Sequence, residues 1–525
     1  VELEQVGIGR VLAHSEKSAV YMADGYARVT GRVGVCMAQS VGAANMAAAL
    51  QDAFLHRAPI LALTGRKPPT FRYRNAYQEI DHAPLYAPVT KLHADVSVIE
   101  ELPLLLAQAL RTAVSGSPRP VHLDLNGLQG EIIENALLDA PALPAAELGS
   151  LPRTPPSAQR ASIEAATQAL AKAERPVLVI GTGAMQAGAQ AAVRAFAETL
   201  SIPIATSLGG RGIVPTTHPL HIGVVGTYSA PPTNELVHQA DLVIFVGTHT
   251  GDQTTNNWTV PPPGCAIVQI DQDPLEIGRN YPSVVGVEGD PRLALEDLLA
   301  ATSEQKPRRA WAEQAAAHYA SWHRSMDPLR HSDDAPIRVE RLCHEISRAL
   351  PANGVLVADT GYSGIWTGTM VELEHPGQTY LRAAGSLGWA FAAALGAQVG
   401  APDRPVLCFS GDGAFYYHLS ELETARRRNI PLVTVINNNS AFGQGLPKVR
   451  QLYGNQPGDP DEIIRFGPTD FAAVARSFGV EGIRVEEPDA IRPALDKALA
   501  MRAPVLVDVV TDALPRAPEP WNPPS

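Results

Sequence analysis

A strand–helix–strand pattern in the last third of the chain constrains the fold more than any other feature. An apolar run at 406–409 leads into Gly411-Asp412-Gly413, a helical pattern and a break at 429–431, and a second apolar run follows at 432–436. A helical crossover makes the two strands parallel. The glycine-rich turn and Asn437-Asn438-Asn439 are therefore expected just past the carboxyl ends of two neighbouring strands, where ligands bind in open parallel sheets.

Asp412 and Asn439 place a carboxylate and an amide oxygen at this edge, beside glycine backbone. Oxygen ligands of this kind suit Mg2+ that holds a diphosphate. The alternative is an ordinary turn at the glycines, with asparagines that only end a strand. A lone Gly-Asp-Gly would favour that alternative, whereas the ordered combination with the asparagines favours the ligand site.

Length, charge and hydropathy exclude several classes of protein. A chain of 525 residues is expected to fold as about three domains. Alternating apolar runs and helical patterns indicate an α/β protein. The net charge of −12 argues against a nucleic-acid or acidic-membrane partner. No apolar run reaches the roughly 18 residues of a membrane span.

The cysteines indicate the compartment. They lie far apart in the sequence, and three of them lie in or beside apolar runs. We expect buried thiols in a reducing compartment, the cytoplasm, rather than disulfides or a zinc site. The four are Cys36, Cys265, Cys343 and Cys408.

Pro-rich or polar stretches divide the chain into three segments. The middle segment reads as a doubly wound domain with strands at 176–180, 242–247 and 266–271. Its Gly181-Thr182-Gly183 turn is half of a dinucleotide fingerprint, but Gln186 stands where the third glycine belongs, so nucleotide binding is weakly indicated. The expected divisions are 1–138, a linker at 139–157, 158–325, a second linker at 326–336, 337–512 and a Pro-rich tail at 513–525.

An acid stands at the start of a helical pattern in the first segment. Ser15 is expected to cap this helix, and Glu16 falls in its first turn. Such an acid stabilises a helix by about 0.3–1 kcal/mol and needs no further role.

The residues that follow Glu16 favour a functional role for this acid over a purely helix-stabilising one. Glu16, the run at 22–28, Thr30-Gly31-Arg32 and Gly34-Val35 closely resemble the pyrimidine-binding domain of acetolactate synthase-like enzymes, and the Gly-Asp-Gly and Asn-Asn pair resembles the signature of thiamine-diphosphate enzymes. The resemblance runs from about residue 10 to 510. It implies three doubly wound parallel-sheet α/β domains: pyrimidine-binding, central and diphosphate-binding. Family members normally carry a strand and a helix before the region that matches Val1, so an incomplete N-terminus is expected.

The resemblance also implies roles for individual residues. Glu16 would contact the aminopyrimidine ring of the cofactor, and Gln78 would line the active site. Leu387 matches the side chain that holds the two cofactor rings in a bent arrangement. The other expected cofactor residues are Gly42, Asn45, Gly411, Gly413, Ala414 and Gly443, and the expected metal ligands are Asp412, Asn439 and the Ala441 carbonyl.

The implied activity uses thiamine diphosphate and Mg2+ to decarboxylate a 2-keto acid and join the fragment to an acceptor carbonyl. The smallest active unit would be a homodimer, and a homotetramer is expected. Two alternatives stay open: a lyase or carboligase of the same family acting on aldehydes or acyl-CoA thioesters, and a non-catalytic homologue that binds the cofactor. The segment 247–252 lacks the arginine-containing run of FAD-binding relatives. We therefore expect a colourless protein that is active without FAD.

Overall fold

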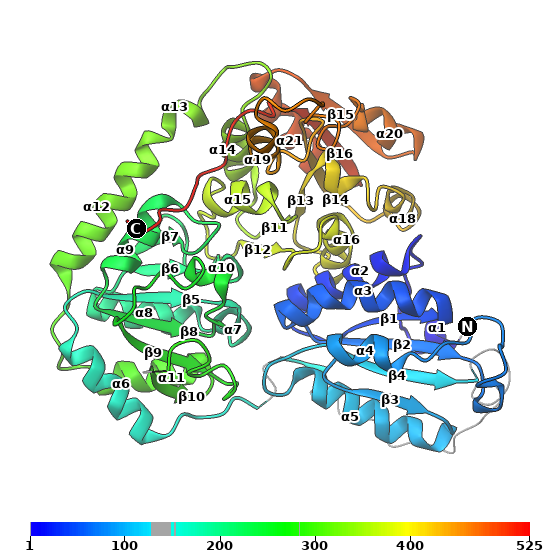
Figure 1. The fold of residues 1–525 in the computed structure, drawn as a ribbon, viewed down its shortest axis with the longest axis horizontal. Coiled ribbons are helices and arrows are strands. Elements are labelled where there is room, and N and C mark those ends of the chain that lie inside the picture. Colours follow the sequence, from blue (N-terminus) through cyan, green and yellow to red (C-terminus); the bar gives the residue numbers. More distant parts are fainter. Residues whose placement is uncertain (1, 128–148, 152–153, 283, 525) are drawn as a thin grey trace.

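The computed structural model describes residues 2–127, 149–151, 154–282 and 284–524. Three parallel sheets, each flanked by helices, follow one another along the chain (Figure 1). This confirms the predicted fold class. Most of the linker predicted at 139–157 lies outside the described residues.

The first sheet is four-stranded, in the order β1-β2-β4-β3. Its two faces bury different side chains. Helices α2 and α3 cover the face of Cys36 and Ala62, and α5 covers the face of Leu61 and Leu123. The elements are β1 (Gly34–Gln39), β2 (Ile60–Arg66), β3 (His93–Val96), β4 (Val121–Asn126), α2 (Glu16–Thr30), α3 (Ser40–His56) and α5 (Leu102–Val114).

Ser15 occupies the N-cap position of α2, but its hydroxyl makes no capping hydrogen bond. The predicted side-chain cap is therefore wrong. This helix end lies near the surface, where water can serve the first N–H groups in place of the hydroxyl. Glu16 is the acid of the first turn.

The central sheet has six strands in the order β10-β9-β8-β5-β6-β7. The order reverses between β5 and β8, which creates a crevice at the carboxyl ends of these two strands. Helices α6, α8 and α11 bury one face, and α9 and α12 bury the other. The elements are β5 (Pro176–Ile180), β6 (Ile204–Thr206), β7 (His221–Val224), β8 (Leu242–Val246), β9 (Ala266–Asp271), β10 (Val284–Glu288), α6 (Arg160–Lys172), α8 (Gln190–Leu200), α9 (Pro231–Gln239), α11 (Pro291–Ala301) and α12 (Arg309–Ser325).

The third sheet has six strands in the order β12-β11-β13-β14-β16-β15, with its reversal between β11 and β13. Its strands are apolar on both sides because helices cover both faces. The elements are β11 (Val355–Ala358), β12 (Thr379–Arg382), β13 (Val406–Gly411), β14 (Leu432–Asn438), β15 (Glu481–Val485), β16 (Val505–Val510), α14 (Val339–Ala349), α15 (Tyr362–Thr369), α16 (Trp389–Gly400), α18 (Glu421–Arg427), α20 (Phe471–Ser477) and α21 (Ile491–Met501).

The first and third domains share one hydrophobic core, because α2 crosses α16 at very short range. A Cβ added to Gly25 would lie 1.9 Å from the Ala393 carbonyl oxygen, and one added to Gly396 would lie 1.8 Å from the Met22 carbonyl oxygen. No side chain fits at either crossing point. The two glycines therefore fix the position of the first domain against the third.

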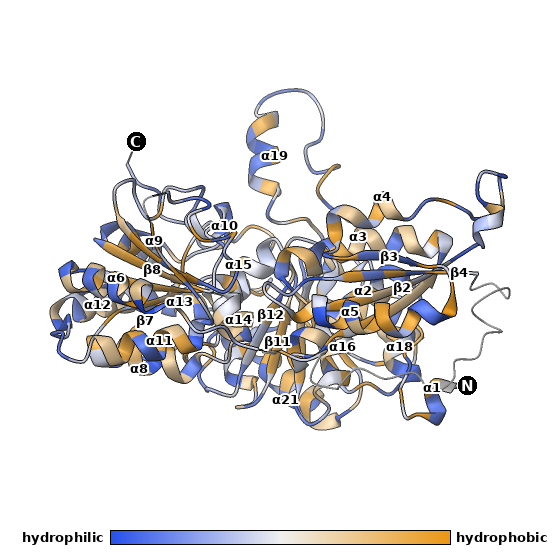
Figure 2. Ribbon diagram, turned by 90° about the horizontal axis from the view of Figure 1, so that it is seen from below, coloured by the Kyte–Doolittle hydropathy of each residue, from blue (hydrophilic) through white to orange (hydrophobic). Residues whose placement is uncertain are grey.

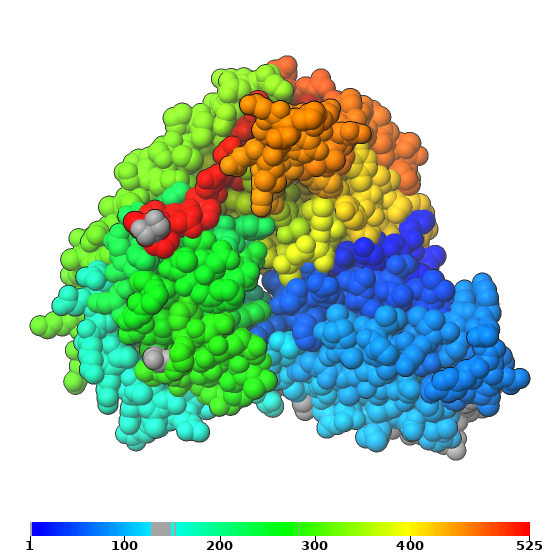
Figure 3. All heavy atoms as spheres, viewed as in Figure 1, coloured from blue at the N-terminus to red at the C-terminus, as the bar shows by residue number. Residues whose placement is uncertain are grey.

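Shorter elements complete the described fold. Helix α19 (Leu446–Tyr453) projects from the body (Figure 2). The C-terminal tail runs from the third domain onto the central one (Figure 3), where the Trp521 carbonyl accepts a hydrogen bond from Asn234. The remaining helices are α1 (Glu2–Gln5), α4 (Ala83–Tyr86), α7 (Thr182–Gln186), α10 (Asp252–Thr255), α13 (Asp327–Arg330) and α17 (Asp412–Phe415). Among the described helices, none is long and apolar enough to cross a membrane.

Candidate active site

Asp412 lies at the carboxyl edge of the third sheet. Strands β13 and β14 pair in parallel, with Gly411 opposite Asn437, so the expectation that they are neighbours is confirmed. The Asp412 side chain is buried, and Oδ1 accepts the Gly413 N–H at 2.7 Å. Oδ2 is buried and has no hydrogen-bond partner among the described residues.

Burial raises the pKa of Asp412 to about 6, and the backbone N–H groups of Gly413 and of 439–441 offset part of that effect. A buried carboxylate oxygen without a partner is costly. A hard cation would satisfy it. Among the described residues, no three His, Cys, Asp or Glu side chains cluster as metal ligands. A metal at this edge would therefore combine Asp412 with neutral oxygens, which fits Mg2+.

The three successive asparagines have different partners. Asn437 Oδ1 accepts the Thr511 hydroxyl at 2.5 Å, and Asn438 donates to Asp508 at 2.8 Å. These two side chains hold the end of β14 against β16. Asn439 Oδ1 accepts the Ala441 N–H at 3.2 Å within a local turn. Of the three, Asn439 and its turn are placed to contribute ligands.

Glycines open the space around this turn. A Cβ on Gly413 would lie 2.5 Å from the Phe442 ring, whereas one on Gly443 would lie 3.4 Å from Asn439 and 3.6 Å from Tyr362. Gly413 therefore admits Phe442, whereas a Cβ at Gly443 would make only ordinary contacts with Asn439 and Tyr362. Gly411 has only Ser363 within 4 Å of such a Cβ, and Ala414 is buried.

Glu16, Gly42 and Asn45 come together in the first domain. Asn45 Nδ2 donates to Glu16 Oε2 at 3.0 Å, and a Cβ on Gly42 would lie 2.7 Å from Glu16 Oε1. The absence of a side chain at Gly42 thus lets the half-buried carboxylate rest on α3, and Asn45 orients it. Oε1 is left to face a ligand.

Gln78 lies on the loop after β2, in the left-handed region at φ +61°. Glu79 anchors this loop because it accepts hydrogen bonds from Arg66 at 3.1 and 2.6 Å. Within the described residues, the Gln78 side chain bonds neither to Glu16 nor to Asn45. The structure therefore leaves Gln78 half-buried and apart from the glutamate.

Leu387 belongs to a loop, residues 384–388, which we call the wedge loop. The N–H groups of Ala384, Gly385 and Ser386 donate to Asp52 of the first domain, at 2.9, 3.1 and 2.9 Å. Sequence reasoning missed Asp52, although an acid on the apolar face of a helical pattern could have drawn attention to it. It also missed Asp359, which follows β11 and accepts the Gly388 N–H at 3.0 Å.

Comparison with known proteins agrees with this geometry. Residues 2–85 match the family described as thiamine pyrophosphate enzyme, N-terminal TPP binding domain. Residues 163–298 match its central domain, and 359–509 match its C-terminal TPP binding domain.

Relatives align over nearly the whole chain. The probable acetolactate synthase large subunit of Methanocaldococcus jannaschii is 32% identical over 525 residues, which cover 97% of this chain and 87% of that protein. The acetolactate synthase isozyme 2 large subunit of Escherichia coli K12 is 32% identical over 523 residues, which cover 97% of this chain and 89% of that protein. The acetolactate synthase large subunit of Corynebacterium glutamicum is 32% identical over 517 residues, which cover 96% of this chain and 80% of that protein.

The chain belongs to the thiamine pyrophosphate enzymes, of the acetolactate synthase-like kind. It is a thiamine-diphosphate-dependent decarboxylase and carboligase, so the predicted family, enzyme class and organic cofactor are confirmed. Two acidic side chains, one per TPP-binding domain, lie at the positions described above: Glu16 in the first domain and Asp412 in the third.

A cavity of about 340 Å3 lies between the central domain of this thiamine pyrophosphate enzyme and its neighbours. It opens at the carboxyl ends of β5 and β8, and Thr248 and His249 of the 247–252 segment line it together with Arg382. The His249 side chain is exposed at this cavity, and the surrounding protein together with nearby arginines lowers its pKa. A neutral histidine offers little charge to a dinucleotide diphosphate. The absence of FAD stays a prediction.

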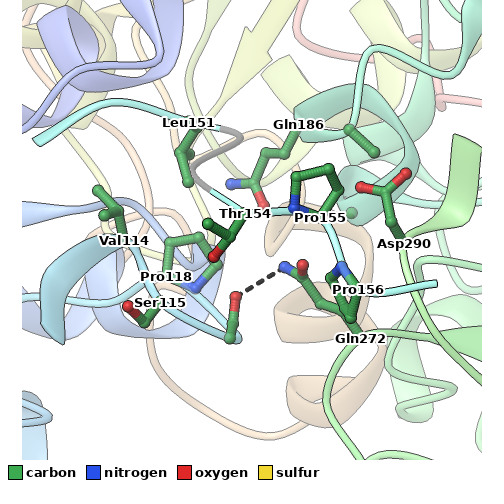
Figure 4. Close-up of a pocket in the computed structure, with 13 residues that line it drawn as sticks. Val114, Ser115, Pro118, Leu151, Thr154, Pro155, Pro156, Gln186, Gln272 and Asp290 are labelled. Carbon is green, nitrogen blue, oxygen red and sulfur yellow. Dashed lines mark hydrogen bonds between the residues drawn. The ribbon is translucent and has the colours of Figure 1, made fainter. Parts of the chain in front are cut away.

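A second cavity of about 120 Å3 lies where residues 114–116, Leu151 and residues 154–156 meet the central domain (Figure 4). Gln272 Nε2 donates to the Gly116 carbonyl across this junction at 2.7 Å. Of the described residues that line the cavity, none is Lys or Arg. Its chemistry does not suit a diphosphate.

Proposed function

We propose that this enzyme uses thiamine diphosphate with Mg2+ to decarboxylate a 2-keto acid and to join the remaining fragment to an acceptor carbonyl. The observation that carries the proposal is the buried Oδ2 of Asp412 at the carboxyl edge of β13, which has no hydrogen-bond partner in the described part of the chain and lies beside the Asn439 turn. The relatives named acetolactate synthase support this donor class. We propose residues 1–138 for pyrimidine binding and 337–512 for diphosphate binding.

The metal would be held by Asp412 Oδ2, the Asn439 side chain and the Ala441 carbonyl. Gly411, Gly413, Ala414 and Gly443 would let the backbone approach the diphosphate. Asp412 supplies the full negative charge among the proposed ligands, so it would contribute most to metal affinity.

Bound thiamine diphosphate supplies a nucleophilic carbon and an electron sink for the loss of CO2. Glu16 would accept a hydrogen bond from the ring nitrogen of the aminopyrimidine and hold that proton. Asn45 keeps Oε2 in place. Oε1, resting on Gly42, therefore points in one direction, which is what a positioned acid–base group needs. Gln78 would donate to the substrate, and Leu387 would support the bend between the cofactor rings.

We propose that Glu16 of one subunit and Asp412 of another act on the same cofactor, in a homodimer or homotetramer. Large apolar side chains are exposed near both half-sites: Val41 and Tyr77 in the first domain are 61% and 78% exposed, and Tyr417 in the third is 54% exposed. Burial of these side chains in a subunit interface would remove apolar surface from water. The cysteines are all free, and three of them are buried. This supports a reducing compartment, for which we propose the cytoplasm.

A same-family lyase acting on aldehydes or acyl-CoA thioesters is the second candidate. Arg382 favours it, because this buried guanidinium lines the 340 Å3 cavity and its Nη1 lacks a partner among the described residues. The two are separated by measuring CO2 release from pyruvate, longer 2-keto acids, glyoxylate and oxalyl-CoA. The proposal expects release from a free 2-keto acid and a ligated product. CO2 release from oxalyl-CoA alone would overturn it, and so would carboligation of aldehydes without CO2 release from any free 2-keto acid.

A further inference from the structure

A buried carboxylate from the first domain binds the backbone of the third. Asp52 lies on α3, and its carboxylate is almost fully shielded from solvent. Three successive N–H groups of the wedge loop converge on it: Ala384 on Oδ1 and Gly385 and Ser386 on Oδ2. Charge-assisted bonds of this kind are about twice as strong as neutral ones.

Arg28 is shared between this carboxylate and that of Asp24. Its Nη2 lies 3.0 Å from Asp52 and 2.6 Å from Asp24, and its Nη1 donates to the Arg382 carbonyl at 2.6 Å. The guanidinium also lies 4.4 Å from the ring centre of Trp389. The acid is thus paired, as a buried charge must be. The same arginine also holds the strand end that leads into the wedge loop.

The other end of the wedge loop is held equally firmly. Asp359 accepts the N–H groups of Gly388 and Ala390, both at 3.0 Å. Gly388 lies at φ +89°, and a Cβ there would lie 2.7 Å from Tyr417. Leu387 therefore sits between two anchored peptide segments and is itself half-buried.

Solvent can reach part of this loop. Gly385 is exposed, so water could serve N–H groups in this part of the loop. Burying a charged group is costly, and replacing it with apolar side chains is often neutral or stabilising. We propose that Asp52 is a positioning residue: it fixes the wedge loop so that Leu387 supports the bent cofactor. This inference rests on the function proposed above for Leu387.

The test compares two variants in the holoenzyme. Asp52→Asn removes the charge that gathers the three N–H groups. Asp24→Asn is the comparison variant, because Asp24 is equally buried and pairs with the same arginine, but it bonds to Trp389, which follows the wedge loop, and accepts no N–H group from residues 384–388. The readouts are thermal unfolding, the affinity for thiamine diphosphate with Mg2+ by calorimetry, and hydrogen–deuterium exchange at the thiazolium C2 of saturated enzyme.

We expect Asp52→Asn to slow C2 exchange about 10- to 100-fold, as a misplacement near 1 Å does. The cofactor Kd should change by less than about threefold, since the diphosphate and metal dominate binding. Asp24→Asn should exchange at the wild-type rate. Equal slowing in the two variants, or none in Asp52→Asn, would overturn the proposal.

Leu387→Ala separates this inference from the function on which it rests. If Leu387→Ala leaves C2 exchange unchanged, the role of Leu387 is wrong. If it slows exchange but Asp52→Asn does not, only the inference about Asp52 fails. The double variant should be no slower than the slower single variant, because both changes act through one side chain. Should Asp52→Asn not fold, Asp52→Glu keeps the charge but displaces the carboxylate, and wild-type exchange in it would refute the proposal.

Discussion

Replacing Asp412 with asparagine should stabilise the enzyme without its cofactor and prevent stabilisation by the cofactor. The pKa of Asp412 is raised from 3.8 to about 6 in the folded chain. Each pKa unit corresponds to about 1.4 kcal/mol, so the ionised carboxylate costs the cofactor-free fold up to about 3 kcal/mol above pH 6. Because the folded-state pKa is raised, the free energy of unfolding falls as the pH rises from about 4 to about 6, and it then levels off. The asparagine side chain of the variant carries no such charge, whereas its amide oxygen can still accept the Gly413 N–H.

Unfolding midpoints, measured by fluorescence between pH 4 and 8, would test this. At pH 7.5 and without cofactor, Asp412→Asn should unfold at a higher denaturant concentration than the wild type, and the difference should vanish near pH 4. Thiamine diphosphate with Mg2+ at 100 times Kd should stabilise the wild type by about 2.7 kcal/mol. It should leave the variant unchanged. A cofactor-free variant no more stable than the wild type at pH 7.5 would refute the reasoning, and so would equal stabilisation of the two proteins by cofactor.

Two further predictions concern the catalytic acid and the flavin. Glu16→Gln should bind the cofactor within about tenfold of the wild type but slow C2 exchange by a factor on the order of 10² or more, because it loses a positioned acid–base group; exchange at the wild-type rate would leave Glu16 a helix-stabilising acid only. The purified enzyme should be colourless and fully active without FAD; a flavin absorbance band in fresh protein, or activity lost on stripping and restored by FAD, would contradict this.

Local sequence patterns were enough to predict the sheets and the sheet edge at which Asp412 lies. The apolar runs at 406–409 and 432–436 became β13 and β14, and parallel pairing followed from the crossover. This placed Asp412 and Asn439 after neighbouring strands. Periodicity and turn chemistry act over a few residues, so a single sequence reveals them.

Contacts between distant segments could not be predicted in the same way. The bonds from Asp52 to residues 384–386 join two domains, and nothing in the spacing encodes them. The partners of Asn437 and Asn438, which bond to the end of the neighbouring strand and to the strand itself, were likewise not predictable from spacing. The cap predicted at Ser15 failed because the residue type fits an N-cap whether or not its hydroxyl turns toward the helix.

The central claim is that Glu16 of one subunit and Asp412 of another act on one cofactor. Coexpression of Glu16→Gln and Asp412→Ala chains carrying different affinity tags, followed by purification through both tags, tests it most directly. Each mixed dimer would contain one site with both residues intact and one with neither. We predict about half of the wild-type activity per mixed dimer, whereas each variant alone is nearly inactive. A mixed dimer as inactive as its parents would contradict the account, because it would mean that both residues serve the cofactor from the same chain.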